Sequence, residues 1–509
     1  MTTSQPATAG LRVADRRASG GAAALLVWSW LAAAGVASAA GAATPAPAAL
    51  PTYLGTLAAG SWTGPIPTLS DPTQSWELYL PGSFSPARKW PVLILFDPRS
   101  RGRAAGEIFR QAADELGWIL ASSNNTMSDG PGEPNARAIN AMIPDVMKRL
   151  PVDEKRIYAG GFSGGAVLAW TVGLKGNYLA GAISIGGRPA PEHLALTPKF
   201  ALFSAAGDGD FNFQPTRELD AIAARAGVPH RLEFFPGPHA WCPPETALAA
   251  VRWLEILAMR DGRAPRDAAR IESTLTAELA AAEALAGTGD ALAAGRKFTQ
   301  IGETFAGIGA KESLERAARR AGELLASPAA KGSVKEEKAA EKYEAQAFRR
   351  IGEASGRLRT SESPVPVGEI RHLLGVDEVL HRRDAGGIGG AAAVRVLAAI
   401  QVHIGFYLTS DLFAAGDYRR ALPGLTLVTE IFPDNSFMLY NLACAQARSG
   451  LPEAALATLG QALDHGLAQP LQLATDADLA SLRDRPEFAP LLERARALDA
   501  ATSPKPSAE

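Results

Sequence analysis

The sequence predicts a doubly wound, mostly parallel α/β sheet in its first half and an all-α domain in its second half. Short apolar runs alternate with helix-forming segments in the first half, as expected when helices cover both faces of a parallel sheet. The second half is rich in alanine, glutamate and arginine and has no strand-like runs. At 509 residues the chain is too long for one ordinary domain, so two or three domains are expected.

The first folded domain is expected to span residues 51–262. Its run at 91–96 is apolar throughout, which is typical of a strand buried on both faces of a parallel sheet. Apolar runs predict strands at 76–80, 91–96, 118–122, 156–159, 182–185, 200–203 and 231–235. Helices are predicted at 104–116, 136–150, 164–174 and 246–259. No long insertion separates the strands, so we expect an open groove without a dedicated lid.

Residues 1–39 have the features of a signal peptide. Three arginines precede an apolar run at 21–36, and residues 37–39 (Ala-Ser-Ala) match a signal-peptidase site. An Ala/Pro-rich linker follows at 40–50. We therefore expect an exported protein, periplasmic or secreted, with no stable membrane span after cleavage. The alternative is that the apolar run is retained as an uncleaved anchor.

The overall composition excludes several classes of function. A net charge of −2 and an isoelectric point near 6.4 predict neither a nucleic-acid partner nor binding to an anionic membrane surface. The sequence has no metal-type cysteine spacing and no paired histidines at helical spacing, so we expect no metal and no cofactor. The two cysteines, Cys242 and Cys444, allow one disulfide at most.

A G-x-S-x-G motif centred on Ser163 lies between the predicted strand at 156–159 and the predicted helix at 164–174. Small flanking residues let a strand turn sharply into a helix, which exposes the serine hydroxyl. The alternative is a packing serine in a glycine-rich turn. Because the motif stands between a strand and a helix in mid-sheet, it predicts a nucleophile.

A nucleophilic serine needs a base to take its proton and a carboxylate to orient that base. After the strand at 200–203, the chain carries Asp208 and Asp210 in one loop. After the strand at 231–235, it carries His239 in another. Both loops follow the carboxyl ends of strands, where open α/β sheets place their sites. The order serine, acid, histidine therefore predicts a catalytic triad, with either aspartate open as the acid.

Three segments of the first domain resemble α/β-hydrolases of the esterase, polyhydroxybutyrate-depolymerase and feruloyl-esterase type. They are Val152–Ala166 (VDEKRIYAGGFSGGA), the acid loop at 207–210 (GDGD) and the histidine loop at 237–241 (GPHAW). The resemblance covers roughly residues 80–259. It implies Ser163 as nucleophile, His239 as general base and then acid, and Asp210 rather than Asp208 as the orienting carboxylate.

The expected oxyanion hole departs from this pattern. One donor would be the N–H of Gly164 and the other an N–H of the loop after the strand at 91–96. Where such enzymes carry His-Gly, this chain reads FDPRSRG at 96–102. Pro98 has no N–H, so Arg99 is the expected second donor.

The second half is expected to form a helical region at 263–400, tetratricopeptide-like repeats with a closing helix at 401–498, and a disordered tail at 499–509. Gly416 and Gly450 lie 34 positions apart, as do Ala421 and Ala455, and this is the tetratricopeptide period. The segment at 331–359 predicts an exposed helix, and 361–390 a loop or flexible connection. A helical array supplies a binding surface or a spacer rather than chemistry.

These patterns favour an exported serine hydrolase that cleaves small or polymeric carboxylic esters. Its helical domain would bind a protein partner or cover the site. Two alternatives remain: a peptidase with the same triad, and a binding scaffold whose hydrolase domain is catalytically impaired.

Overall fold

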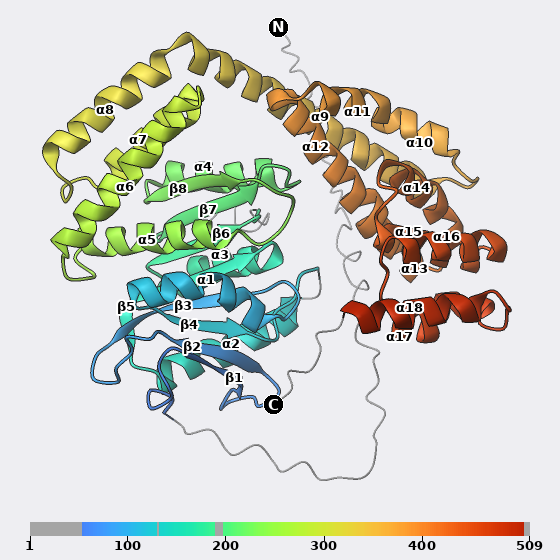
Figure 1. Ribbon diagram of the computed structural model, residues 1–509, viewed down its shortest axis with the longest axis horizontal. Coiled ribbons are helices and arrows are strands. Elements are labelled where there is room, and N and C mark those ends of the chain that lie inside the picture. Colours follow the sequence, from blue (N-terminus) through green and yellow to red (C-terminus); the bar gives the residue numbers. More distant parts are fainter. Residues whose placement is uncertain (1–52, 130–131, 189–196, 503–509) are drawn as a thin grey trace, which may run out of the picture.

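The computed structural model describes residues 53–129, 132–188 and 197–502 (Figure 1). The predicted signal peptide, the linker at 40–50 and residues 503–509 of the predicted tail lie outside these ranges. Figure 1 shows the sheet with its helices at lower left, and α6–α8 above the end of the sheet that carries β8. The long helix α9 leads from these to the remaining helices on the right.

An eight-stranded sheet forms the centre of the described part of the first half, in the order β1-β2-β4-β3-β5-β6-β7-β8. β1 and β2 are antiparallel to their neighbours, and all strands from β4 to β8 run parallel. The strands are β1 (Ser61–Pro67), β2 (Ser75–Leu80), β3 (Trp90–Phe96), β4 (Ile119–Ser123), β5 (Val152–Phe162), β6 (Gly181–Ile185), β7 (Ala201–Gly207) and β8 (His230–Phe235). β3 is buried at every position, as its apolar run predicted.

Helices cover both faces of this sheet. One face packs against α1 (Gly102–Leu116) and α5 (Pro244–Arg260) around Phe109 and Val251. The other packs against α2 (Gly132–Arg149), α3 (Gly164–Gly176) and α4 (Phe213–Ala226). The architecture confirms the predicted fold class, a doubly wound, mostly parallel α/β sheet followed by an all-α region.

Two elements of the sheet half were not predicted. β1 carries Gly64 and Pro65 in its middle, and Ile66 is its one buried residue, so it lacks an apolar alternation. α4 begins three residues after Asp210, directly behind the loop that carries both aspartates. In both cases contacts with the rest of the sheet decide the structure, because the local pattern is weak.

The second half is helical from Ala268 onward. Its first helices are α6 (Ala268–Gly287), α7 (Ala291–Thr304), α8 (Lys311–Ala326) and α9 (Pro328–Thr360). The segment at 361–390, expected as a loop or flexible connection, instead contains α10 (Val367–Leu374) and α11 (Val376–Ala385). Their apolar residues Ile370, Leu374 and Val379 are buried in a core cluster with α9 and α12, which orders this polar stretch.

The expected boundary between residues 400 and 401 falls inside a continuous helix, Gly387–Ala414. This helix consists of α12 (Gly387–Ile400), the π-helical turn η2 (Gln401–Leu408) and α13 (Thr409–Ala414). Among the described residues it is the one helix long and apolar enough to cross a membrane, with a mean hydropathy of 1.6. Its most apolar stretch is 56% buried inside the protein, as a core helix would be.

The expected repeat segment forms paired helices. They are α14 (Tyr418–Ile431), α15 (Ser436–Arg448) and α16 (Pro452–Asp464), followed by α17 (Pro470–Thr475), η3 (Ala477–Leu482) and α18 (Phe488–Thr502). Gly416 and Gly450, with φ of 74° and 81°, each precede a helix in the left-handed region that favours glycine. The tetratricopeptide type stays a prediction. The expected tail is partly wrong, because α18 includes residues 499–502.

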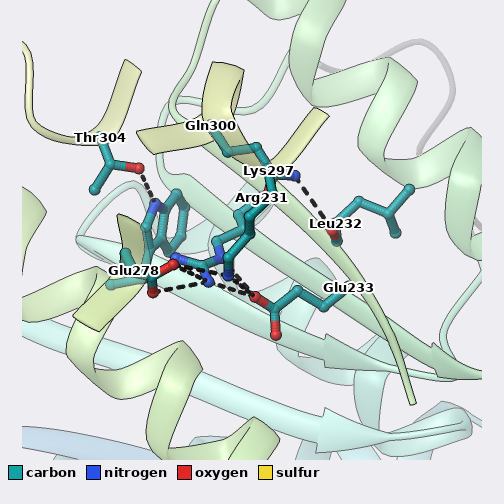
Figure 2. A network of polar contacts seen from close by, with 8 residues as sticks. Arg231, Leu232, Glu233, Glu278, Lys297, Gln300 and Thr304 are labelled. Carbon is teal, nitrogen blue, oxygen red and sulfur yellow. Dashed lines mark hydrogen bonds and ion pairs between the residues drawn. The ribbon is translucent and has the colours of Figure 1, made fainter. Parts of the chain in front are cut away.

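A charged network around the buried Arg231 joins β8 to the first helices of the second half (Figure 2). The guanidinium of Arg231 bonds to the carboxylates of Glu233 and Glu278, and Lys297 Nζ lies 2.7 Å from Glu278 Oε2. Gln300 Nε2 donates to the carbonyl of Leu232 at 3.3 Å. β8 is the last strand of the sheet, so α6 and α7 cover an edge that would otherwise expose backbone groups.

Candidate active site

Ser163 occupies a strained turn between β5, which ends at Phe162, and α3, which begins at Gly164. Its φ of 53° and ψ of −120° are rare for a residue with a side chain. The Ser163 N–H donates to the carbonyl of Ile185 at the end of β6, at 2.9 Å. The turn lifts the partly exposed serine above the carboxyl ends of the central strands.

The glycines of the motif are required by close backbone contacts. A Cβ at Gly165 would lie 2.0 Å from the carbonyl oxygen of Phe96 on β3. A Cβ at Gly161 would lie 2.2 Å from the carbonyl group of Gly165. Both distances are far shorter than a van der Waals contact, so α3 could not start this close to β3 and β5 with any larger residue.

The structure brings Ser163, His239 and Asp210 into one chain of hydrogen bonds. His239 Nε2 lies 2.9 Å from Ser163 Oγ. His239 Nδ1 lies 2.8 Å and 2.9 Å from the two carboxylate oxygens of Asp210. An ionised carboxylate can only accept, so Nδ1 carries the proton and Nε2 is left to accept the serine proton. This is the tautomer that a general base for Ser163 needs.

The two candidate acids differ clearly in position. Asp210 is fully buried, and its carboxylate also accepts from the N–H of Asn212 at 2.7 Å. Asp208 is exposed, and its carboxylate accepts from the N–H of Gly237 at 3.0 Å instead of contacting His239. Asp208 therefore shapes the histidine loop, and Asp210 holds the imidazole.

Aromatic rings hold the imidazole from two sides. The ring centroid of His239 lies 4.6 Å from that of Phe162 and 4.3 Å from that of Phe211. Phe162 comes from the turn that carries the serine, and Phe211 from the loop that carries the acid. The side chain of His239 is only 19% exposed, so its ring can move little.

The expected second oxyanion donor is not available in this structure. The N–H of Arg99 donates to Asp97 Oδ1 at 2.8 Å, so the expectation for Arg99 needs correction. The N–H of Gly164 donates to the hydroxyl of Ser128 at 3.1 Å. Pro98 was correctly excluded as a donor, but the neighbouring carboxylate takes up the next N–H.

Asp97 is a buried carboxylate that connects two loops of the site, a role that the sequence analysis did not predict. It follows β3, is fully buried, and also accepts from the N–H of Arg101 at 3.2 Å and from Trp241 Nε1 at 2.9 Å. Trp241 lies two residues after His239, so this carboxylate ties the loop after β3 to the histidine loop. The sequence did contain a signal, a charged residue directly after a fully apolar strand. Such a position is often buried, and a buried carboxylate needs several hydrogen-bond donors around it.

The second half contacts the loops that carry the acid and the histidine. Arg395 of α12 donates to the carbonyl of Asp208 at 3.0 Å. Phe211 packs against the core cluster of the second half, and its ring centroid lies 6.4 Å from that of His403 in η2. The site is thus not the open groove expected from the sequence, because the helix Gly387–Ala414 lies beside it.

Two polar side chains of η2 face the same region. Tyr407 Oη donates to the carboxylate of Asp129 at 3.3 Å. Burial and the nearby Asp129 carboxylate raise the pKa of Tyr407 to about 12, so its phenol stays protonated at neutral pH. Burial, and next the charge of Arg188, lower the pKa of His403, which favours its neutral form.

No group of three or more metal-ligating side chains occurs within residues 53–129, 132–188 and 197–502. Cys242 and Cys444 are both buried and free, so the one conceivable disulfide is not formed. Burial raises the pKa of Cys242 to about 12, which makes it an unreactive thiol although it follows the histidine loop.

Comparisons with known proteins give similarities to solved structures. No family model matches the chain, and no curated protein matches it. Among solved structures, it is similar to FphF, a fluorophosphonate-binding serine hydrolase of Staphylococcus aureus, at 16% identity and a TM-score of 0.32, over 38% of this chain and 98% of that one. Esterase PE8 is 19% identical with a TM-score of 0.31, over 36% of this chain and 98% of that one. Dipeptidyl peptidase 4 of Porphyromonas gingivalis is 16% identical with a TM-score of 0.31, over 38% of this chain and 35% of that one.

Proposed function

We propose that this protein is an exported serine hydrolase that cleaves carboxylic esters through an acyl-enzyme intermediate. The observation that carries the proposal is the pair of contacts made by His239, one to Ser163 Oγ at 2.9 Å and one to Asp210 Oδ1 at 2.8 Å. A packing serine or a structural histidine would not require the two contacts together with a strained φ at the serine.

The chemistry follows from these contacts. Ser163 Oγ attacks the ester carbonyl carbon while its proton passes to His239 Nε2, and the carbonyl electrons move onto the oxygen. Collapse of this intermediate breaks the bond to the leaving oxygen, which takes the proton from Nε2. A water oxygen then bonds to the acyl carbon while a water proton passes to Nε2. Collapse of this second intermediate breaks the bond from that carbon to Ser163 Oγ, which takes the proton back from Nε2, and the acid leaves. Asp210 stays ionised throughout and stabilises the imidazolium.

Site covering is the proposed role of the helical half next to the triad. The supporting observations are the contact of Phe211 with His403 and the bond from Arg395 to the carbonyl of Asp208. Excluding water from one side of a site strengthens its electrostatic interactions. The helices from α14 to α18 lie further from these contacts along the chain, and their proposed role is to bind a protein partner.

Export is the remaining part of the proposal. It rests on the arginines, the apolar run and the Ala-Ser-Ala segment within residues 1–39. Mass spectrometry of the N-terminus after expression in a bacterial host tests it. A new N-terminus at residue 40 in the periplasmic fraction supports export, and an intact N-terminus in the membrane fraction supports an uncleaved anchor.

A fluorophosphonate probe tests the hydrolase function directly. We expect the wild type to be labelled at Ser163 and Ser163→Ala to remain unlabelled. The matched pair Asp210→Asn and Asp208→Asn separates the triad from its surroundings. The first should lower kcat by about 10⁴-fold, and the second should change it less than about threefold, because an amide oxygen can still accept from Gly237. Equal losses in both variants would contradict the triad.

Ester and amide cleavage are separated by substrate. We expect p-nitrophenyl acyl esters to be cleaved much faster than the matching peptide p-nitroanilides, and the reverse would favour a peptidase. The impaired-scaffold alternative is favoured by one observation, that the N–H groups of Gly164 and Arg99 both have acceptors. No labelling and no ester cleavage by the correctly folded wild type would establish it.

A further inference from the structure

Both N–H groups expected to stabilise negative charge on the substrate oxygen, those of Gly164 and Arg99, already have acceptors within the protein. Oxyanion sites normally use two donors, and losing one costs on the order of 10²–10³ in rate. The N–H of Arg99 donates to the Asp97 carboxylate, and the N–H of Gly164 donates to a neutral hydroxyl, which is the weaker acceptor for an oxyanion to replace. The side chain that contacts Gly164 is Ser128, from the loop that follows β4.

Ser128 is packed tightly against the start of α3. A Cβ at Gly164 would lie 2.0 Å from Ser128 Oγ and 3.0 Å from Ser128 Cα. Ser128 is only 8% exposed, and its Oγ lies 3.1 Å from the Gly164 nitrogen. The Gly164 N–H is the first amide after the nucleophile, so this hydroxyl lies where an oxyanion bound to that amide would accept its hydrogen bond.

The surrounding loop holds Ser128 in place. Its N–H donates to the carbonyl of Pro98 at 2.9 Å, which joins the loop after β4 to the loop after β3. The preceding residue, Met127, bonds to the side-chain amide of Asn135 through both its N–H and its carbonyl, each at 2.8 Å. Rotation of the Ser128 side chain is thus the freedom that remains at this point.

A hydroxyl has one proton to donate and two lone pairs to accept with. Ser128 Oγ accepts from Gly164, and within the part of the chain that the structure describes its own proton has no acceptor. We propose that the Ser128 hydroxyl is the second oxyanion donor, acting beside the Gly164 N–H. The inference rests on the proposed function, because it concerns the oxygen of the same acyl group.

When Ser163 Oγ bonds to the carbonyl carbon, the electron pair of the C=O bond moves onto the oxygen. This oxygen replaces Ser128 Oγ as the acceptor for the Gly164 N–H. The Ser128 side chain rotates, and its hydroxyl donates a second hydrogen bond to the same oxygen. No covalent bond to Ser128 forms or breaks. In the resting protein, the same hydroxyl keeps the Gly164 N–H satisfied.

Ester hydrolysis by variants at Ser128 tests the inference. With a p-nitrophenyl ester, Ser128→Ala should lower kcat on the order of 10²-fold and change KM little, because the oxygen is charged only in the transition state. Ser128→Cys, which keeps the shape and offers a weak donor, should fall between the wild type and Ser128→Ala. The affinity for a trifluoromethyl ketone, which forms an oxyanion on Ser163, should fall by a factor similar to that of kcat/KM.

The matched control is Ser122→Ala. Ser122 Oγ is buried without a hydrogen-bond partner at the end of β4, so its removal should leave kcat unchanged. If Ser128→Ala has an unchanged or raised kcat while Ser163 is still labelled by fluorophosphonate, the inference is wrong and the proposed function stands. Ser128 would then only occupy the oxyanion position in the resting protein. A wild type that is neither labelled nor active overturns the proposed function instead. If Ser128→Ala fails to fold, Ser128→Cys and the ketone affinity decide.

Discussion

Two buried arginines connect the halves of the molecule, and they do so in different ways. Arg231 lies on β8 and reaches Glu278 of α6 at 3.0 Å. Arg395 lies on α12 and pairs with Glu344 of α9, with 3.1 Å between Nε and Oε2. Each is 4% exposed, so each holds a charge that burial penalises unless a carboxylate stays close.

The difference lies in what else each arginine contacts. Arg231 is surrounded by side chains, Glu233 and the Glu278–Lys297 pair, at the covered edge of the sheet (Figure 2). Arg395 also donates to the main-chain carbonyl of Asp208, two residues before the proposed acid Asp210. One contact therefore attaches the helices to the sheet, and the other attaches them to the loop that carries the proposed acid.

The largest expected effect is on stability. Arg231→Ala should lower the free energy of unfolding by about 3 kcal/mol, because it removes the buried cation between Glu233 and Glu278 and leaves the partly exposed Lys297 beside them. Urea denaturation followed by tryptophan fluorescence measures it. The control Arg296→Ala removes an exposed ion pair with Glu337 and should cost less than about 1 kcal/mol. Equal losses would remove the distinction between buried and exposed pairs.

A lysine at each position sharpens the comparison between the two arginines. Arg395→Lys keeps the charge beside Glu344 but loses the fork that also reaches Asp208, so we expect kcat to fall about tenfold as the acid loop loosens. Arg231→Lys should lower the free energy of unfolding by about 1–2 kcal/mol and leave kcat unchanged. The two kcat values on one ester decide. A fall in both variants would show that the contacts are coupled.

A smaller effect is expected at the rim of the site. Tyr407→Phe removes the hydrogen bond to Asp129 and little apolar contact. The variant therefore loses the free energy of one hydrogen bond, about 0.5–1.5 kcal/mol. If η2 covers bound substrate, KM should rise a few-fold while the Tm stays within about 1 °C of the wild type. A Tm loss with unchanged KM would mean that this contact only attaches the helix.

The smallest expected effect is on the pH dependence of stability. Burial alone would raise the pKa of Glu278, but the charges of Arg231 and Lys297 lower it below its usual value of 4.5. Its contribution to stability is therefore full above the unfolded pKa and is lost as the pH falls through the lower folded pKa. The stability difference between the wild type and Glu278→Gln should be largest near about pH 7 and shrink below about pH 4.5. A difference that grows in acid would contradict the assigned direction.

Much of the sheet half was predictable because its signals are local. Seven of the strands followed from apolar runs, and Ser163, Asp208, Asp210 and His239 were named as candidates from loops behind such runs. The choice between Asp208 and Asp210 was open from the residues alone, since both lie in one short loop. Their side chains point to different partners, Gly237 and His239, which only the folded loops define.

By itself, the sequence determined seven strands and four helices of the sheet half, without β1 and α4, and the motif that turns at Ser163. These follow from periodicity and from glycines that admit a close contact, both of which are written into neighbouring residues. Only the tertiary structure decided that Asp97 takes the N–H of Arg99, that Ser128 contacts Gly164, and that η2 lies beside Phe211. The last two contacts join residues far apart in the chain and depend on how loops meet in space. The first is local, and the structure decided it by burying Asp97, whose carboxylate then takes the nearest N–H groups.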